Sequence, residues 1–186
     1  CCDPRLVADN WTGSSAKLEA CLELVTEAVA GGHRILLFSQ FTSMLELLAK
    51  RLDEAGVSHF TLQGSTPKPV RAEQVRRFNQ GEADVFLISL RAGGTGLNLT
   101  AADIVIHYDP WWNLAAQNQA TDRAYRIGQR NPVQVYRLIA QDTIEEKIVE
   151  LQQAKQSLAD TVTGGADGAI LSMNPEQLLQ LLGEEA

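Results

Sequence analysis

Short apolar runs alternate with segments of helical spacing along most of this chain. Residues 35–38 and 85–88 are continuously apolar, which is typical of strands that are buried on both faces of a sheet. The pattern predicts strands over residues 35–38, 59–62, 85–88, 104–108 and 133–139.

Capping residues and amphipathic spacing predict helices between these strands. Ser14 and Ser15 are suited to begin the first helix, Thr42 the second, and Thr143 one that follows the last strand. The predicted helices cover about residues 16–30, 42–55, 70–79, 113–127, 143–159 and 175–182. Strands that alternate with helices predict an α/β fold, with a mainly parallel sheet between two helical layers. Ligands of such sheets bind at the carboxyl ends of the strands.

The character of the chain changes after residue 140. Residues 1–140 form the predicted α/β body, and residues 141–163 an acidic helix with Ile144 and Ile148 on its apolar side. We expect this helix to pack on the body, because its apolar side would otherwise be exposed to water. Residues 164–186 contain a glycine-rich break and a short leucine-rich helix.

Charge is unevenly distributed. The chain has 186 residues and a net charge of −7, which argues against a generic nucleic-acid-binding protein. Residues 138–186 carry nine acidic residues and two lysines, whereas residues 1–137 are balanced, with 14 basic and 14 acidic residues. Any anion-binding surface must therefore be local and lie in the body.

The cysteines and apolar runs exclude several classes. Cys1, Cys2 and Cys21 have no zinc-binding spacing, so no metal site and no disulfide framework are predicted. This usage fits a reducing, intracellular compartment. No apolar run approaches the length of a membrane span.

One predicted helical face suits a polyphosphate. Gln119, Arg123 and Arg126 follow one another at spacings of four and three residues, so they lie on one face. Two neighbouring guanidinium groups repel each other unless an anion lies opposite, and their planar forks match phosphate oxygens. The alternative is a pair of surface arginines, with Asp122 paired to Arg126.

A glycine-rich loop, residues 91–96, follows the third strand. Its backbone N–H groups are suited to phosphate, but a tight strand-to-helix turn explains its spacing better. The G-K-[ST] ending of a phosphate-binding P-loop occurs nowhere in the chain. An arginine face without such a loop indicates half of a nucleotide site, completed by another domain or subunit.

Trp111 and Trp112 are adjacent and cannot both point the same way. One is expected in the core and the other free to contact a partner, such as nucleic acid. Burial of both in the core or at a domain contact is the alternative.

Three segments resemble the C-terminal lobe of Swi/Snf-type ATPases, which belong to helicase superfamily two. They are residues 84–99, 103–113 and 119–129, in the order in which the family has them. Residues 36–41, and residues 62–66 together with Arg71, resemble two earlier motifs of that lobe. The resemblance covers nearly the whole chain.

This resemblance implies a RecA-like lobe with a brace helix over residues 141–163. It implies a missing N-terminal lobe whose P-loop and Asp-Glu motif bind ATP and Mg²⁺. It assigns Arg123 and Arg126 as arginine fingers, Gln119 as the residue that orders them, Gly94 and Gly96 near the nucleotide, and Ser89, Arg91, Asn98, Trp112 and Arg71 to DNA. Where the family commonly has Trp-Asn-Pro, Asn113 is here followed by Leu114, which shifts the expected helix start slightly.

The whole protein is then expected to be an ATP-driven double-stranded DNA translocase that remodels bound proteins. Nucleosomes, RNA polymerase and repair complexes are all open as targets, in a bacterial cytoplasm or a eukaryotic nucleus. The chain by itself is not expected to hydrolyse ATP. Alternatives are a lobe of a strand-separating DNA or RNA helicase, a non-catalytic interaction module with this fold, and an unrelated flavodoxin-like domain.

Overall fold

The computed structural model of this chain describes residues 2–7, 11, 13, 15–90, 92, 97–122 and 132–163. The chain divides into two compact units, Cys1–Ile148 and Val149–Ala186. The first unit contains the sheet, the helices around it and the first residues of the acidic helix. No helix among the described residues is long and apolar enough to cross a membrane.

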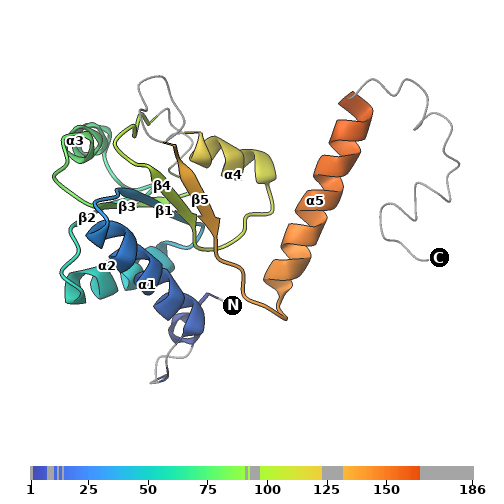
Figure 1. The fold of residues 1–186 in the computed structure, drawn as a ribbon, viewed down its shortest axis with the longest axis horizontal. Helices are drawn as coiled ribbons and strands as arrows, with labels where there is room; N and C mark the ends of the chain where they lie inside the picture. Colours follow the sequence, from blue (N-terminus) through green and yellow to red (C-terminus); the bar gives the residue numbers. More distant parts are fainter. Residues whose placement is uncertain are drawn as a thin grey trace, which may run out of the picture. The chain divides into compact units, whose positions relative to one another are not determined.

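Five parallel strands form the sheet of the first unit (Figure 1). They are β1 (Ile35–Ser39), β2 (His59–Leu62), β3 (Val85–Ser89), β4 (Ile104–His107) and β5 (Gln134–Arg137), in the order β2-β3-β1-β4-β5. Every residue of β1, β3 and β4 is buried, as their continuous apolar runs predict. The predicted α/β architecture with a parallel sheet is confirmed.

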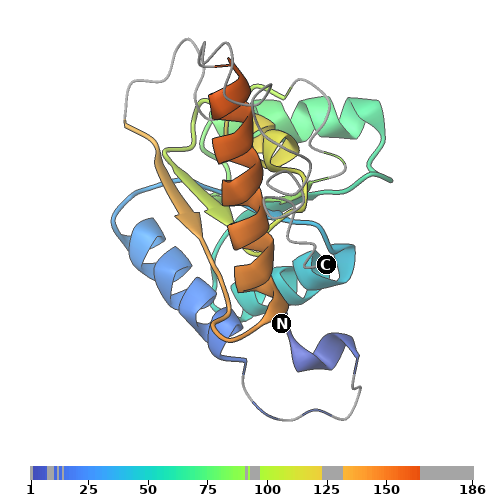
Figure 2. The same cartoon turned by 90° about the vertical axis from the view of Figure 1, so that its right-hand side faces the viewer.

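Helices cover both faces of this sheet (Figures 1 and 2). On one face lie α1 (Ala16–Ala30) and α2 (Thr42–Glu54), and on the other lie α3 (Lys68–Asn79) and α4 (Leu114–Thr121). A short 3₁₀ turn, η1 (Pro4–Leu6), precedes α1, and α5 (Ile144–Thr163) follows the last strand.

The pleat of the strands divides the core into two clusters. In β1, Ile35 and Leu37 join the cluster formed with α1 and α2, whereas Leu36 and Phe38 join the cluster on the opposite face. That second cluster includes Phe78 of α3 and residues of α4. Successive side chains of a strand point to opposite faces, so the central strand contributes to both cores.

Several predicted boundaries differ from the observed ones. Phe41, rather than Thr42, occupies the N-cap of α2, and no side chain caps that end. Ser15 precedes α1, but its hydroxyl donates to the Cys2 carbonyl at 3.4 Å instead of capping the helix. The last strand is shorter than predicted, since β5 lies at the edge of the sheet and pairs with β4 only over residues 134–137.

The start of α5 is fastened to the first unit by a buried ion pair. Lys17 Nζ lies 2.5 Å from Glu145 Oε2, and the two side chains are 8% and 5% exposed. The same carboxylate oxygen accepts the Ala140 N–H at 2.9 Å. Thr143 caps the helix as predicted, since its hydroxyl oxygen accepts the Glu145 N–H at 3.1 Å.

The predicted apolar side of this helix is only partly buried in the first unit. Ile148 is 6% exposed, whereas Ile144 is 53% exposed, contrary to the expectation that both would pack. The buried contact at the helix start is therefore largely ionic, made by Glu145, and Ile148 adds the apolar part.

Removal of the lysine should destabilise the fold markedly. Lys17→Ala leaves the Glu145 carboxylate buried without its cation, and breaking a buried pair in this way costs roughly 3 kcal/mol or more. Urea unfolding of this chain measures the loss.

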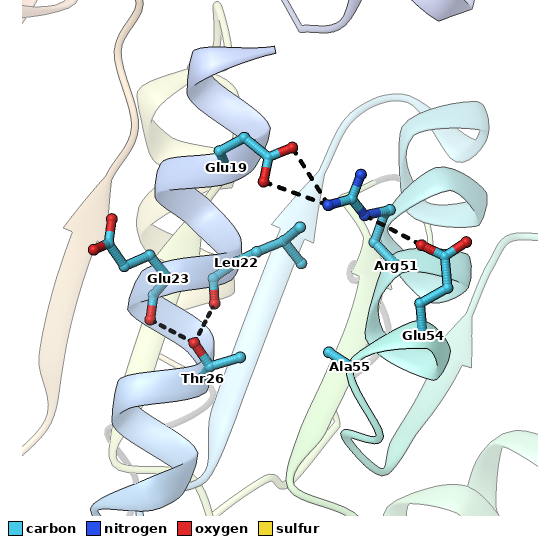
Figure 3. A pocket seen from close by; sticks show the side chains of 7 residues that line it. All are labelled: Glu19, Leu22, Glu23, Thr26, Arg51, Glu54 and Ala55. Atoms are coloured by element: carbon cyan, nitrogen blue, oxygen red, sulfur yellow. Dashed lines mark hydrogen bonds and ion pairs between the residues drawn. The ribbon is translucent and has the colours of Figure 1, made fainter. Parts of the chain in front are cut away.

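Arg51→Ala is the matched control. Arg51 pairs with Glu19 and Glu54 in a shallow groove between α1 and α2, with its side chain 29% exposed (Figure 3). An exposed pair contributes about 1 kcal/mol at most. Equal losses for the two variants would contradict the buried role of Lys17.

Candidate functional site

The connections of the sheet create a crevice at its carboxyl edge. The helix that follows β1 is α2, which covers one face, whereas α4 follows the neighbouring strand β4 and covers the other face. The two chain segments therefore diverge where β1 and β4 end (Figure 1). In open parallel sheets this switch point is where ligands bind.

Asp109 bridges the two strand ends at this point. Its Oδ2 accepts the Ser39 hydroxyl at 2.5 Å, and its Oδ1 accepts the Gln40 N–H at 3.0 Å. The Gln40 side-chain amide donates to the Pro110 carbonyl at 3.3 Å. These bonds fix the segment after β4 against the end of β1.

The Asp109 carboxyl group is almost fully buried, at 1% exposure. Burial raises its pKa to about 6, although the bonds from Ser39 and Gln40 favour the charged form. The Lys17 charge also lowers this pKa, whereas the Glu145 charge raises it. The carboxyl group is a structural bridge whose charge is costly, because desolvation disfavours the ionised form.

The two tryptophans that follow have different surroundings. Trp111 is partly buried against the second core cluster, and its backbone N–H donates to Gln117 Oε1 at 3.2 Å. Trp112 is 56% exposed. The expectation that one ring packs while the other is accessible is confirmed.

A hollow of about 460 Å³ lies beside the exposed ring. Its lining comes from the chain ends around the crevice and from the first residues of α5: Cys2, Gln40, Phe41, Asp109, Pro110, Trp112, Ile144, Glu145 and Ile148. None of these described residues is basic, and two are acidic. The hollow is therefore poorly suited to a phosphate group, which prefers guanidinium or ammonium partners.

The other predicted DNA-facing residues have varied environments. Ser89, at the end of β3, is 2% exposed, so its side chain is not at the surface of this unit. Asn98 is exposed, and its carbonyl accepts the Asn79 side-chain amide at 2.8 Å. The Arg71 guanidinium donates to the Ala92 carbonyl at 3.3 Å and so contacts the loop that follows β3.

Gln119 is exposed on α4. The remaining predicted site residues lie outside the described residues: Arg91, Gly94, Gly96, Arg123 and Arg126. Their assigned roles stay predictions. In the described part of the chain, no cluster of three or more His, Cys, Asp or Glu side chains is arranged to bind a metal ion.

Two buried side chains at this site were not singled out from the sequence. Asp109 connects two strands, and Gln117, at 1% exposure, connects α4 to the Trp111 backbone. Both partnerships depend on the folded chain. The apolar strand before Asp109 shows that this residue lies at the functional edge, but not which residues it contacts.

These features define a RecA-like α/β lobe with a crevice at its carboxyl edge. Residues 16–128 match the family model for the helicase conserved C-terminal domain. The chain therefore belongs to this family, and its relatives place it among the C-terminal lobes related to Swi/Snf ATPases.

Its relatives are bacterial and eukaryotic. The chain is 44% identical to the putative ATP-dependent helicase/translocase YwqA of Bacillus subtilis, over 91% of this chain and 18% of that protein. It is 46% identical to the chromatin-remodeling ATPase INO80 of Aspergillus terreus, over 89% of this chain and 10% of that protein. An uncharacterized ATP-dependent helicase of Mycoplasma pneumoniae is 43% identical, over 90% of this chain and 16% of that protein. The chain thus spans less than a fifth of these relatives.

A solved structure shows the same fold. The crystal structure of the C-terminal part of the Fun30 ATPase domain superimposes with a TM-score of 0.71 and 36% sequence identity. The match covers 74% of this chain and 45% of that one.

The stability of the lobe should depend on pH through Asp109. Its folded pKa of about 6 exceeds its ordinary value of 3.8, so the folded state favours the protonated form. The stabilisation is fully present below the ordinary pKa of 3.8 and is lost as the pH rises through 6. Asp109→Asn is neutral throughout, so its free energy of unfolding should rise relative to the unsubstituted chain by roughly 2 kcal/mol between pH 4 and 7.

Urea unfolding at a series of pH values measures this difference. Asp53→Asn serves as the control for loss of one carboxylate, because the Asp53 side chain is 76% exposed. If the free energy of unfolding varied with pH in the same way for Asp109→Asn and for the unsubstituted chain, ionisation of Asp109 would not destabilise the fold.

Proposed function

We propose that this chain is the second motor lobe of an ATP-dependent double-stranded DNA translocase. The observation that carries the proposal is the helicase C-terminal match over residues 16–128, which includes Gln119, Arg123 and Arg126. The similarity to proteins described as an ATP-dependent helicase/translocase and as a chromatin-remodeling ATPase supports this class.

In this proposal the nucleotide is shared between two lobes. A preceding N-terminal RecA-like lobe binds ATP and Mg²⁺, because this chain has no G-K-[ST] phosphate loop. Arg123 and Arg126 reach the transferring phosphoryl group from this lobe, and Gln119 orders that contact. Arginine fingers stabilise charge that develops in the transition state.

DNA contacts the same edge of the lobe at other residues. The exposed Trp112 ring is attached to a segment that Asp109 and Pro110 fasten to the end of β1, so the ring is presented on a rigid support. An exposed aromatic ring is suited to stacking or insertion at a nucleic-acid groove. The proposed DNA set is completed by Arg91, Asn98 and Arg71, whereas the side chain of Ser89 is buried and is not part of this proposal.

The partners follow from this division of roles. They are the N-terminal lobe of the same protein, double-stranded DNA, and a DNA-bound protein that the motor displaces, such as RNA polymerase. The protein then acts where the DNA is, at a bacterial nucleoid or in a nucleus.

The two tryptophans allow the DNA role to be separated from a structural one. Trp112→Ala should change the free energy of unfolding by about 0.5 kcal/mol or less, because the ring is 56% exposed. In the two-lobe protein it should lower DNA-stimulated ATP hydrolysis. Trp111→Ala, the structural counterpart, should cost about 2 kcal/mol of stability because its ring packs on the core.

Urea unfolding and steady-state hydrolysis with and without DNA measure both effects. A large stability loss for Trp112→Ala would assign its ring to the core. If DNA stimulated ATP hydrolysis by that variant fully, Trp112 would not be a DNA contact.

The arginine assignment is tested in the two-lobe protein. Arg123→Ala and Arg126→Ala should each lower single-turnover hydrolysis at saturating DNA by roughly a thousand-fold. ATP affinity should fall much less, because the other lobe supplies most ground-state contacts. Arg→Lys at either position should also lose hydrolysis, since an ammonium group does not reproduce the planar guanidinium fork.

Arg76→Ala is the control, because Arg76 is an exposed arginine of α3 paired with Glu73. It should hydrolyse ATP at the unsubstituted rate. If both alanine variants at positions 123 and 126 do the same, the central assignment is wrong.

A further inference from the structure

The inner face of α4 is tied to β4 and to the segment that follows that strand. Thr121 Oγ1 lies 2.9 Å from Nε2 of His107, the last residue of β4. One turn earlier, Gln117 Oε1 accepts the Trp111 N–H at 3.2 Å. His107 and Gln117 are each 1% exposed, whereas Thr121 and Trp111 are half-buried, so each bond has one partner in the interior.

The direction of these bonds follows from the donors available. Nδ1 of His107 is buried and has no hydrogen-bond partner in the described part of the chain, and an N–H there would cost more than an acceptor. We therefore place the ring hydrogen on Nε2, which donates to the Thr121 hydroxyl oxygen, and that hydroxyl donates to the Gln117 main-chain carbonyl at 3.3 Å. The bonds run in one chain from His107 through Thr121 to the Gln117 carbonyl.

The imidazole is fixed and neutral in this position. Burial, followed by the Arg137 charge, lowers the pKa of His107 to about 4. The ring stacks on Phe38 at a centroid distance of 5.5 Å. A neutral ring with one free acceptor costs less than a buried imidazolium with an unsatisfied N–H, so this state is compatible with the interior.

These contacts join two segments: the one at Trp111 and Trp112, for which a DNA contact is proposed, and the end of α4, which leads to the proposed arginine fingers. Trp112, the residue after Trp111, has an exposed ring. At the other end, Arg123 follows Thr121 by two residues in the sequence. A displacement of the segment at Trp111 must therefore move α4 or break the bond to Gln117, whose side chain is buried and would lose a partner.

We propose that His107, Gln117 and Thr121 are positioning residues that couple DNA contact at Trp112 to the placement of the arginines beyond α4. None of the three touches DNA or ATP in this proposal. They act through the segments that they join, and the inference rests on the proposed function.

The test uses the two-lobe protein and compares variants that differ by one hydrogen-bonding group. Thr121→Val keeps the shape of the side chain and removes the hydroxyl, whereas Thr121→Ser retains the hydroxyl. Thr26→Val is the matched control, because the Thr26 hydroxyl makes the same kind of bond, to the Leu22 carbonyl at 2.9 Å, in α1 on the opposite face (Figure 3).

DNA-stimulated kcat and the DNA concentration at half-stimulation are measured for each variant. Thr121→Val should lower this kcat roughly fivefold, the factor that corresponds to one neutral hydrogen bond. Its half-stimulating DNA concentration should stay within about twofold, because no proposed DNA contact changes. Thr121→Ser should restore kcat, and Thr26→Val should leave it unchanged.

Gln117 provides a second, independent variant. Gln117→Leu removes the acceptor of the Trp111 backbone N–H without placing a charge in the interior, so it should lose DNA-stimulated kcat. This variant decides the matter if Thr121→Val does not fold.

The outcomes separate the coupling from the proposed function. If the unsubstituted two-lobe protein shows no DNA-stimulated hydrolysis, the proposed function fails and the coupling fails with it. If DNA stimulation is present and Thr121→Val and Gln117→Leu retain full kcat, the coupling alone is overturned. Parallel weakening of DNA binding and kcat in both variants would also overturn it, because a positioning role changes kcat alone.

Discussion

A buried carboxylate at the carboxyl edge of the sheet is the interaction on which the geometry of this lobe depends. Asp109 accepts bonds from Ser39 and from the Gln40 backbone, and these require β1 and β4 to be adjacent and in register. Phe38 pairs with His107, so both strands end at the same level. A shift of register would leave the carboxyl buried without its donors, at a cost of several kcal/mol.

This constraint acts together with the two-sided core. Because side chains alternate along each strand, β1 fills one cluster with Ile35 and Leu37 and the other with Leu36 and Phe38. The helices that follow β1 and β4 can then pack on opposite faces, and the chain segments diverge above the strand ends. The crevice is thus a consequence of which face each helix buries, and Asp109 determines how closely its two sides approach.

Much of the fold could be predicted from local pattern because the strands are buried on both faces. A continuous apolar run such as residues 85–88 has few alternatives once its length and its flanking turns are considered. The outcome for Trp111 and Trp112 was also predictable, since adjacent side chains diverge.

The missed features depend on partners distant in sequence. Asp109 meets residues 70 positions earlier, and the Lys17 partner of Glu145 is 128 positions away, so no local pattern reveals either bond. The prediction that Ile144 packs on the body was wrong for a related reason. An apolar stripe predicts that a helix packs, but at the start of α5 the buried contact is made by the charged Glu145, and Ile144 is left exposed.

The lining of the hollow next to Trp112 differs from that of a phosphate-binding site. The hollow next to Trp112 is lined by apolar and acidic side chains, which would repel phosphate oxygens. The two arginines that we propose as fingers follow α4 in the sequence, at positions 123 and 126. Asp109 and Glu145 instead make contacts within the fold, since Asp109 joins the end of β1 to the segment after β4 and Glu145 pairs with Lys17. In the proposed function, this lobe contributes the two arginines and the exposed Trp112 ring, and a partner lobe contributes the phosphate-binding loop.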